Sequence, residues 1–226
     1  MFSVFFRYVC EVTNNLCSGL LPGHFDHFFK SVTFTNGGMK YSLINFRFSQ
    51  MLGGSRLFGS YFVKLSSRYR LSPLLSTRQL RSVWGPNANS VERDEDIAYI
   101  AELIQYKGGN LLMNKLMYYL WDRAHFEFRW FSALREIDIP IRFVWADSDA
   151  VSPVAIPQYF QSFVPGMTLT LVKDAGHFFV LEKPGKWMEV VIKPLISSWR
   201  SYKRFKATGS QYVSYDKFRC DLLFTQ

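Results

Sequence analysis

Two short apolar runs, each followed by a polar loop, restrict the fold of this chain more than any other feature. Residues 141–145 lead into Asp149, and residues 169–172 lead into His177. Both runs are short, rich in Ile, Val, Leu or Phe and bounded by Pro or Gly, which is typical of buried strands in a parallel sheet. Residues 153–166 between them are long enough for a crossover helix. The sequence therefore predicts a strand–helix–strand unit of the α/β class.

The polar residues that follow these strands are candidates for an active site. Ligands of open parallel sheets bind at the carboxyl ends of the strands, so Asp149 and His177 are predicted to meet at one edge. An aspartate that orients a histidine supplies two members of a catalytic triad. Three alternatives remain open: Asp149 caps a turn or helix, Asp147 takes the acid role, or His177 is a hydrogen-bonded histidine at a strand end.

Three short motifs around these side chains carry a family resemblance: Ala146-x-x-Asp149-x-x-x-Pro153, Ala175-Gly176-His177-Phe178 and Leu181-Glu182-x-Pro184. Together they resemble the closing half of the α/β-hydrolase family, in the branch with epoxide hydrolases, haloalkane dehalogenases and mesoderm-specific-transcript-like proteins. In that family the acid follows the penultimate strand and the histidine follows the last one. The resemblance implies an α/β fold, catalytic roles for Asp149 and His177, and only the C-terminal portion of the family's sheet.

A third strand is predicted upstream, at residues 30–35. It ends at Asn36-Gly37-Gly38, where glycine permits a sharp exit, and it resembles the strand from which the hydrolase chain leaves its core for a helical cap. Asn36 either directs its amide into the pocket as a substrate-binding residue or caps the turn. The predicted organisation is a core remnant at 1–38, a cap at 39–128, the C-terminal core at 129–199 and a basic, disordered tail at 200–226.

The sequence pattern of the predicted cap, residues 39–128, is typical of helices. Acidic residues at 92–96 fill a first turn, apolar residues at 97–104 recur at helical spacing, and Gly108-Gly109 ends the run. A second helix is expected at 111–125, with one apolar stripe made by Leu112, Leu116, Tyr119 and Leu120. A final helix is expected at 184–199, with Pro194 kinking or shortening it.

The resemblance also implies a role for tyrosines of the cap, because cap tyrosines of epoxide hydrolases activate the epoxide oxygen. The sequence does not choose among them, and packing or surface positions remain the alternative. The candidates are Tyr61, Tyr69, Tyr99, Tyr106, Tyr118 and Tyr119.

The nucleophile of the family mechanism is not visible in this chain. The family places it on a strained turn between small residues, as in Gly-x-Ser-x-Gly. Neither that motif nor His-Asp-x-Gly occurs in the sequence. The stretch where the family would place the nucleophile corresponds to residues 5–10, and the only candidate nucleophile in it is Cys10, which lacks flanking small residues. The resemblance therefore leaves two hypotheses: a hydrolase of epoxide, ester or carbon–halogen bonds whose triad is incomplete in this fragment, and a non-catalytic copy that binds a small ligand or a partner.

Composition limits the remaining classes of function. A chain of 226 residues with 48% hydrophobic content can bury one sizeable core. The net charge of +9 is interpreted as solvated surface, with a local +4 at 200–226 and the remainder scattered, so nucleic acid is not an expected partner. No run approaches the about 18 apolar residues of a transmembrane helix.

Cofactors and metals are not expected either. Cys10, Cys17 and Cys220 lack metal-site spacing, and their odd number predicts a reducing, cytoplasmic location. The cluster at 24–27, with two histidines and an aspartate, is interpreted as a solvated loop because helical geometry would not place its ligands on one face. The expected partners are a small apolar substrate or ligand and, through an exposed sheet edge, a second copy of the chain.

Overall fold

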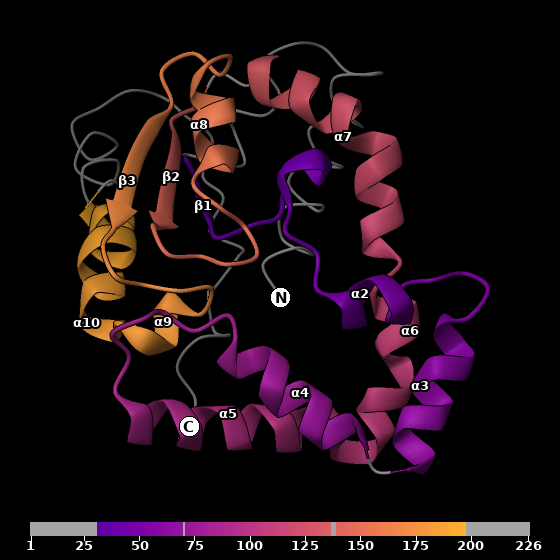
Figure 1. Ribbon diagram of the computed structural model, residues 1–226. Coiled ribbons are helices and arrows are strands. Elements are labelled where there is room, and N and C mark those ends of the chain that lie inside the picture. Colours follow the sequence, from indigo (N-terminus) through magenta and orange to yellow (C-terminus); the bar gives the residue numbers. More distant parts are fainter. Residues whose placement is uncertain (1–30, 70, 137–138, 198–226) are drawn as a thin grey trace, which may run out of the picture.

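The computed structural model describes residues 31–69, 71–136 and 139–197. Along the chain, β1 (Val32–Thr35) is followed by a long helical segment, and β2 (Ile141–Ala146), α8 (Ala155–Gln161) and β3 (Thr168–Val172) come after it. Short helices α9 (Phe179–Glu182) and α10 (Pro184–Trp187) follow β3. Figure 1 shows the sheet at the upper left, α4 and α5 below it, and α2, α3 and α6 on the right.

The three strands form one parallel sheet in the order β1-β2-β3. Val32 is paired with Ile141 at one end of β1, and Ala146 is paired with Val172 at the far end of β3. The strand–helix–strand unit and the third strand predicted from sequence are therefore present. Because all three strands run in the same direction, their carboxyl ends lie at one edge of the sheet, where the following loops gather.

The two faces of the sheet are covered by different helices because β2 alternates its side chains. Phe143 and Trp145 point to one face, where they pack with Phe160 of α8 and with the second half of α7 (Tyr119–Glu136). Val144 and Ala146 point to the other face, where the residues after β3 cover them. β2 is buried on both faces, which explains its continuous apolar sequence.

The segment between β1 and β2 is helical, as expected. It contains the 3₁₀ turn η2 (Tyr41–Leu43), α2 (Phe48–Gly53), α3 (Gly59–Arg68), α4 (Leu71–Arg81), α5 (Ser90–Gln105), η3 (Tyr106–Leu112), α6 (Met113–Leu116) and α7. Asn89 caps α5 by accepting a hydrogen bond from the Val91 N–H. α7 passes without a break through residue 128, where the sequence placed the boundary between cap and core.

The helix expected at residues 111–125 has other bounds, and of its expected apolar stripe only Leu120 is buried. Lys107 and Gly108 have positive φ angles and interrupt the helical conformation after α5. The helices α6 and α7 that follow are separate elements. Leu112 and Leu116 are exposed, whereas Asn114 is buried and donates a hydrogen bond of 2.7 Å to the Gly53 carbonyl. A polar contact with the turn between α2 and α3 therefore decides the orientation of α6 in place of the apolar stripe.

The last helix contains a π-helical turn, η4 (Met188–Ile192), which follows α10 and precedes Pro194. Pro194 has no N–H to donate to the Val190 carbonyl four residues earlier. The Arg142 guanidinium of β2 donates to this carbonyl instead, at 3.1 Å. The proline thus frees an acceptor that ties the helix to the sheet.

Among residues 31–69, 71–136 and 139–197, no helix combines the length and the apolar character required to cross a bilayer.

The predictions for Cys10, for the cluster at 24–27 and for the tail at 200–226 lie outside the described residues.

Candidate functional site

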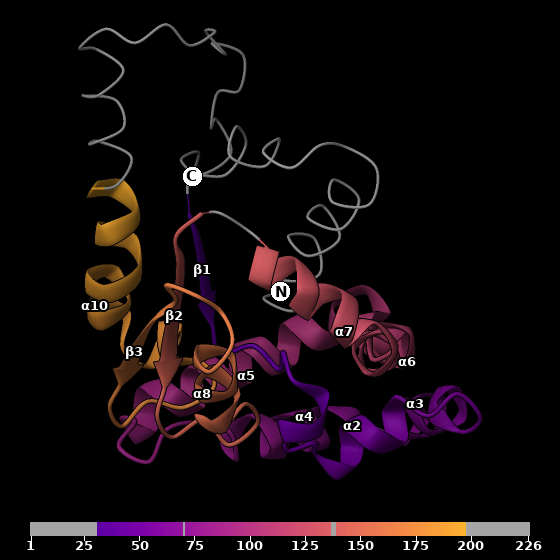
Figure 2. The same ribbon diagram turned by 90° about the horizontal axis from the view of Figure 1, so that it is seen from above.

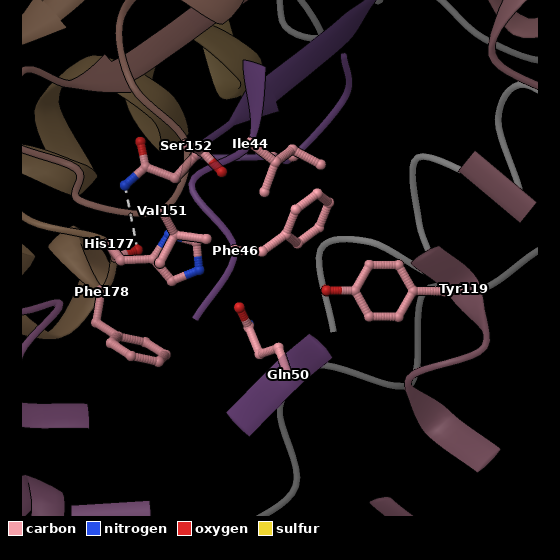
Figure 3. Close-up of a pocket in the computed structure, with 11 residues that line it drawn as sticks. Ile44, Phe46, Gln50, Tyr119, Val151, Ser152, His177 and Phe178 are labelled. Carbon is pink, nitrogen blue, oxygen red and sulfur yellow. Dashed lines mark hydrogen bonds between the residues drawn. The ribbon is translucent and has the colours of Figure 1, made fainter. Parts of the chain in front are cut away.

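A cavity of about 150 Å³ lies at the carboxyl edge of the sheet, between the sheet loops and the helical segment (Figure 3). Its wall is mixed, with aliphatic and aromatic side chains around a few polar groups. The lining residues are Asn36, Gly37, Gly38, Ile44, Phe46, Gln50, Tyr119, Val151, Ser152, His177 and Phe178. Apolar side chains around a few convergent polar groups are a feature of ligand sites, and at this volume the cavity is smaller than the roughly 300–1,000 Å³ of typical ones.

Asp149 and His177 meet at the wall of this cavity. The His177 Nδ1–H donates to Asp149 Oδ2 at 2.8 Å, and the other Asp149 oxygen accepts from the Val151 and Ser152 N–H groups, each at 2.8 Å. The Asp149 side chain is 0% exposed, whereas that of His177 is 27% exposed. Because Asp149 holds Nδ1, the ring nitrogen that remains available is Nε2, which Figure 3 shows directed toward the cavity.

Asp147, the rival for the acid role, does not reach the histidine. It is exposed and accepts a hydrogen bond from the neighbouring Ser148 hydroxyl at 2.9 Å. Its backbone N–H donates to the Val172 carbonyl, which directs the chain away from β2 before Asp149 turns back. The structure therefore brings together Asp149 and His177 and leaves Asp147 outside.

Asn36 occupies the end of β1 with a positive φ of 42°. Its amide nitrogen donates to the carbonyls of Gly176 and His177 at 3.0 and 3.1 Å, and its oxygen accepts from the Ala146 N–H at 2.8 Å. One side chain thus joins the ends of β1 and β2 to the histidine loop. Asn36 also lines the cavity, and its role toward a substrate remains a prediction.

Tyr119 is the tyrosine of the helical segment that faces the site. Figure 3 shows its hydroxyl directed into the cavity on the side opposite His177. Burial raises the pKa of Tyr119 above its ordinary value of 10.0, and the positive charge of Arg123 partly opposes this increase. The hydroxyl therefore stays protonated at neutral pH and is available as a hydrogen-bond donor. Arg123 is itself buried, lies 5.4 Å from the Tyr119 ring and donates to the Gly38 carbonyl.

Glu182 holds the histidine loop against the helical segment. Its Oε2 accepts from the N–H groups of Gly85 and Gly176 at 2.9 and 2.8 Å, and its Oε1 accepts from the Phe178 N–H at 3.2 Å. The His177 N–H donates to the Val83 carbonyl at 2.9 Å, which closes the contact. The position of His177 therefore depends on residues 83–85 of the helical segment.

Two glycines allow this close approach of the backbones. A Cβ atom on Gly176 would lie 2.3 Å from the Gly85 nitrogen, and one on Gly85 would lie 2.8 Å from the Gly176 nitrogen. Real Cβ atoms do not approach backbone atoms so closely, so neither position accepts a side chain without separation of the two segments. The rings of Trp84 and Phe178 lie 5.2 Å apart beside this contact and bury it.

Several of these features were missed or left open by sequence reasoning. Spacing did not select Tyr119, and nothing near Gly85 indicated that it would contact the histidine loop. Glu182 was recognised only as part of a motif. Ser152 received no role, although it lines the cavity and its buried hydroxyl has no hydrogen-bond partner. Such a hydroxyl is an unused polar group in the wall.

The described residues contain no nucleophile of the kind that the α/β-hydrolase mechanism places after a strand earlier in the chain than β1. The stretch in which the sequence placed the nucleophile, residues 5–10, lies outside them. Within the described ranges, no group of three or more His, Cys, Asp or Glu side chains has the arrangement of a metal site. The site therefore consists of an oriented imidazole, a buried carboxylate and a facing phenol.

Comparison with known proteins finds similarity over part of the chain. The mouse mesoderm-specific transcript protein is 29% identical over 126 residues, which cover 50% of this chain and 36% of that protein. LipZ of Mycobacterium tuberculosis, described as a hydrolase, is 27% identical over 95 residues, covering 42% of this chain and 33% of LipZ. The chain therefore spans about a third of the length of these relatives. No protein-family model matches.

Solved structures share the arrangement of elements. An esterase from Thermogutta terrifontis superposes with a TM-score of 0.53 at 13% identity, covering 75% of this chain and 56% of the esterase. A protein from Burkholderia cenocepacia described as an aryl esterase gives a TM-score of 0.53 at 12% identity, covering 84% and 61% of the two chains. At these identities the likeness concerns the fold.

The Asn36→Gly variant separates the two roles considered for Asn36. Glycine tolerates the positive φ, so the substitution removes three hydrogen bonds without adding backbone strain. We expect the free energy of unfolding to fall by roughly 2–4 kcal/mol, because the buried Ala146 N–H and two carbonyls lose their partners. Urea unfolding followed by tryptophan fluorescence measures this change. Unchanged stability together with weakened ligand binding would contradict the structural role.

The titration of Glu182 predicts a pH dependence of stability. Burial raises the pKa of this carboxyl above its ordinary value of 4.5, with the three backbone N–H groups opposing and the charge of Asp149 contributing. A carboxyl that binds its proton more tightly in the folded state stabilises the fold below 4.5 and loses that contribution as pH rises through the folded pKa. We therefore expect the stability of the wild type relative to Glu182→Gln to decrease from acidic to neutral pH.

The matched control for this measurement is Glu189→Gln. Glu189 is exposed, and its hydrogen bond with Lys186 lowers its pKa, so the wild type should gain stability relative to this variant over the same pH interval. The gain should be small because solvent screens the pair. Urea unfolding of the three proteins across pH gives both slopes, and a rising or flat difference for Glu182 would contradict the expectation.

Proposed function

Because the described part of the chain has the fold of the C-terminal part of an α/β-hydrolase, we propose that Asp149 and His177 are the acid and base of a hydrolytic triad. The observation that carries this proposal is the 2.8 Å hydrogen bond between a fully buried carboxylate and an imidazole at the cavity wall. The reaction class is hydrolysis of an ester, epoxide or carbon–halogen bond in a small apolar substrate. The cap role of residues 39–128 is part of the same proposal.

In this mechanism each residue acts at a defined atom. Asp149 accepts the Nδ1–H of His177, which fixes the tautomer and stabilises the imidazolium that forms when Nε2 takes a proton. Nε2 takes that proton from the attacking group, either the nucleophile or the water that hydrolyses the intermediate. The α/β-hydrolase mechanism also needs a nucleophile, and none is assigned among the described residues. Apolar lining residues such as Ile44, Phe46 and Phe178 exclude water from the reacting bond.

Tyr119 supports the epoxide branch of the proposal. Its protonated hydroxyl faces the cavity opposite the imidazole, so it can donate a hydrogen bond to an epoxide oxygen while the carbon is attacked from the other side. The negative charge that develops on this oxygen is then stabilised where it forms. The oxyanion that an ester forms is stabilised in the α/β-hydrolase mechanism by backbone N–H groups beside the nucleophile, and not by a cap tyrosine.

A second candidate function is ligand binding without catalysis. The observation that favours it is that, among the described residues, no Ser, Cys or Asp side chain is hydrogen-bonded to Nε2 of His177, whose side-chain hydrogen bond is the one from Nδ1 to Asp149. In this case the cavity binds a small apolar ligand without converting it, and the incomplete sheet associates with a partner or a second copy. Ligand-induced thermal stabilisation without turnover is the expected behaviour.

The role of the histidine is tested with p-nitrophenyl esters and styrene oxide as substrates. We expect His177→Ala to lower kcat/KM by at least about a thousandfold, because the base and its orientation are both removed. His125→Ala is the matched control, since His125 is exposed and bonds only its own helix through the Trp121 carbonyl. Equal turnover in the wild type and His177→Ala would exclude the triad. Turnover by neither, with ligand binding retained, would select the second candidate.

The epoxide branch is tested by Tyr119→Phe with both substrates. We expect turnover of styrene oxide to fall by about a hundredfold and ester turnover to change little, because only the epoxide oxygen needs the hydroxyl. Tyr118→Phe is the control, because its hydroxyl donates to Asn114 at 3.3 Å on the neighbouring helix turn. A parallel loss on both substrates would assign Tyr119 to packing of the site.

A further inference from the structure

The positive charge of this chain is concentrated in one segment. Residues 27–91 contain nine of the 27 Lys and Arg residues and none of the 18 Asp and Glu residues. The rest of the chain carries 18 residues of each sign, so this segment accounts for the whole net charge of +9. The interpretation of the charge as scattered, apart from the C-terminal tail, was therefore wrong. Within the described part of this segment lie helices α2–α4.

The helix α3 and the turn before it present this charge together with large apolar side chains. Leu57 is 82% exposed and Phe58 is 64% exposed, which is unusual for neighbouring large hydrophobic residues. We call this patch the α3 surface. It consists of the exposed residues Arg56, Leu57, Phe58, Tyr61, Lys64, Leu65 and Arg68.

The helical periodicity of α3 separates this surface from its packed face. Gly59, Val63 and Ser66 are buried, whereas Tyr61, Lys64 and Arg68 follow one another at spacings of three and four residues on the opposite side. Figure 2 shows α3 at the end of the molecule farthest from the sheet. The exposed apolar side chains are therefore not packing positions for the described core.

We propose that the α3 surface docks on an anionic lipid bilayer. Leu57, Phe58 and Leu65 provide apolar side chains that can enter the boundary between head groups and acyl chains. Lys64 and Arg68 provide positive charges for the anionic head groups. Their aliphatic stems can lie along the apolar region of the bilayer while their charged ends stay in water. No ion pair is recorded for Lys64 or Arg68 among the described residues.

The chemistry of the surface favours lipid over other acidic partners. Nucleic acids are bound through phosphate contacts and base stacking, which make no use of exposed aliphatic side chains such as Leu57 and Leu65. The next helix repeats the same combination, with Leu71, Leu74 and Arg78 exposed on α4. Exposed apolar and basic side chains in a segment without any acid match a membrane whose surface is negative and whose interior is apolar.

Vesicle flotation of the full chain tests this proposal without reference to any enzymatic activity. We expect binding to vesicles of phosphatidylcholine with phosphatidylserine, weaker binding to phosphatidylcholine alone, and loss of the difference at high salt. Equal binding to neutral and anionic vesicles would overturn the proposal. Preferential binding of single-stranded RNA over anionic vesicles at the same salt concentration would also overturn it.

Matched variants assign the binding to the α3 surface. Lys64→Glu with Arg68→Glu should lower partitioning by at least about tenfold, and Leu57→Ser with Phe58→Ser should lower it by a similar factor. The charge control is Lys173→Glu with Lys193→Glu, and the apolar control is Leu171→Ser with Ile196→Ser, all exposed positions near the sheet. All variants keep the basic residues of the tail.

The controls decide the outcome. Retained binding in both control variants together with loss in both α3-surface variants is the expected result. A circular dichroism spectrum and a thermal transition equal to those of the wild type show that each variant is folded. Loss of binding in the charge control equal to that of Lys64→Glu with Arg68→Glu would show a response to net charge alone and would overturn the assignment to α3.

Discussion

The side chain of Asn36 is the connection on which the arrangement of the site depends. Where three parallel strands end at one edge of a sheet, the loops that follow them must still find hydrogen-bond partners for their buried backbone N–H and carbonyl groups. Asn36 does this from the end of β1, because it accepts from the Ala146 N–H of β2 and donates to the carbonyls of Gly176 and His177. Its positive φ turns the chain toward the helical segment at the same point. The strand end, the histidine loop and the exit from the sheet are thus fixed by one amide.

A second constraint joins the helical segment to the loop that carries His177. The contact between Gly85 and Gly176 brings two backbones closer than any Cβ atom permits, and the Glu182 carboxylate accepts N–H groups from both sides of it. Movement of residues 83–85 therefore moves His177, whose N–H is bonded to Val83. The helical segment supplies the opposite wall of the cavity through Tyr119 and also one of the supports of the imidazole. Changes in its packing are consequently transmitted to His177 and to its hydrogen bond with Asp149.

The sequence predicted the features that follow from local pattern and chain order. Buried strands and their following polar loops were recognised from short apolar runs, and the meeting of Asp149 with His177 followed from the geometry of parallel strands. Contacts between distant segments were not recoverable, because nothing near Gly85 encodes that its neighbour is Gly176. The error at α6 has the same origin: the apolar spacing of Leu112 and Leu116 was outweighed by a tertiary hydrogen bond from Asn114. Local pattern thus predicted the sheet well and the helical segment less well.

The distribution of charge connects the cavity with the proposed membrane surface. Residues 27–91 carry nine basic residues and no acid, so a negative surface attracts the segment that contains α2–α4 more strongly than the other described parts of the chain. The same segment contributes Ile44, Phe46 and Gln50 to the cavity wall. Apolar solutes concentrate in bilayers because burial of their surface away from water is favourable. A chain held with α3 at the lipid boundary would therefore meet such solutes on the side where its helical segment, and not its sheet, lines the cavity.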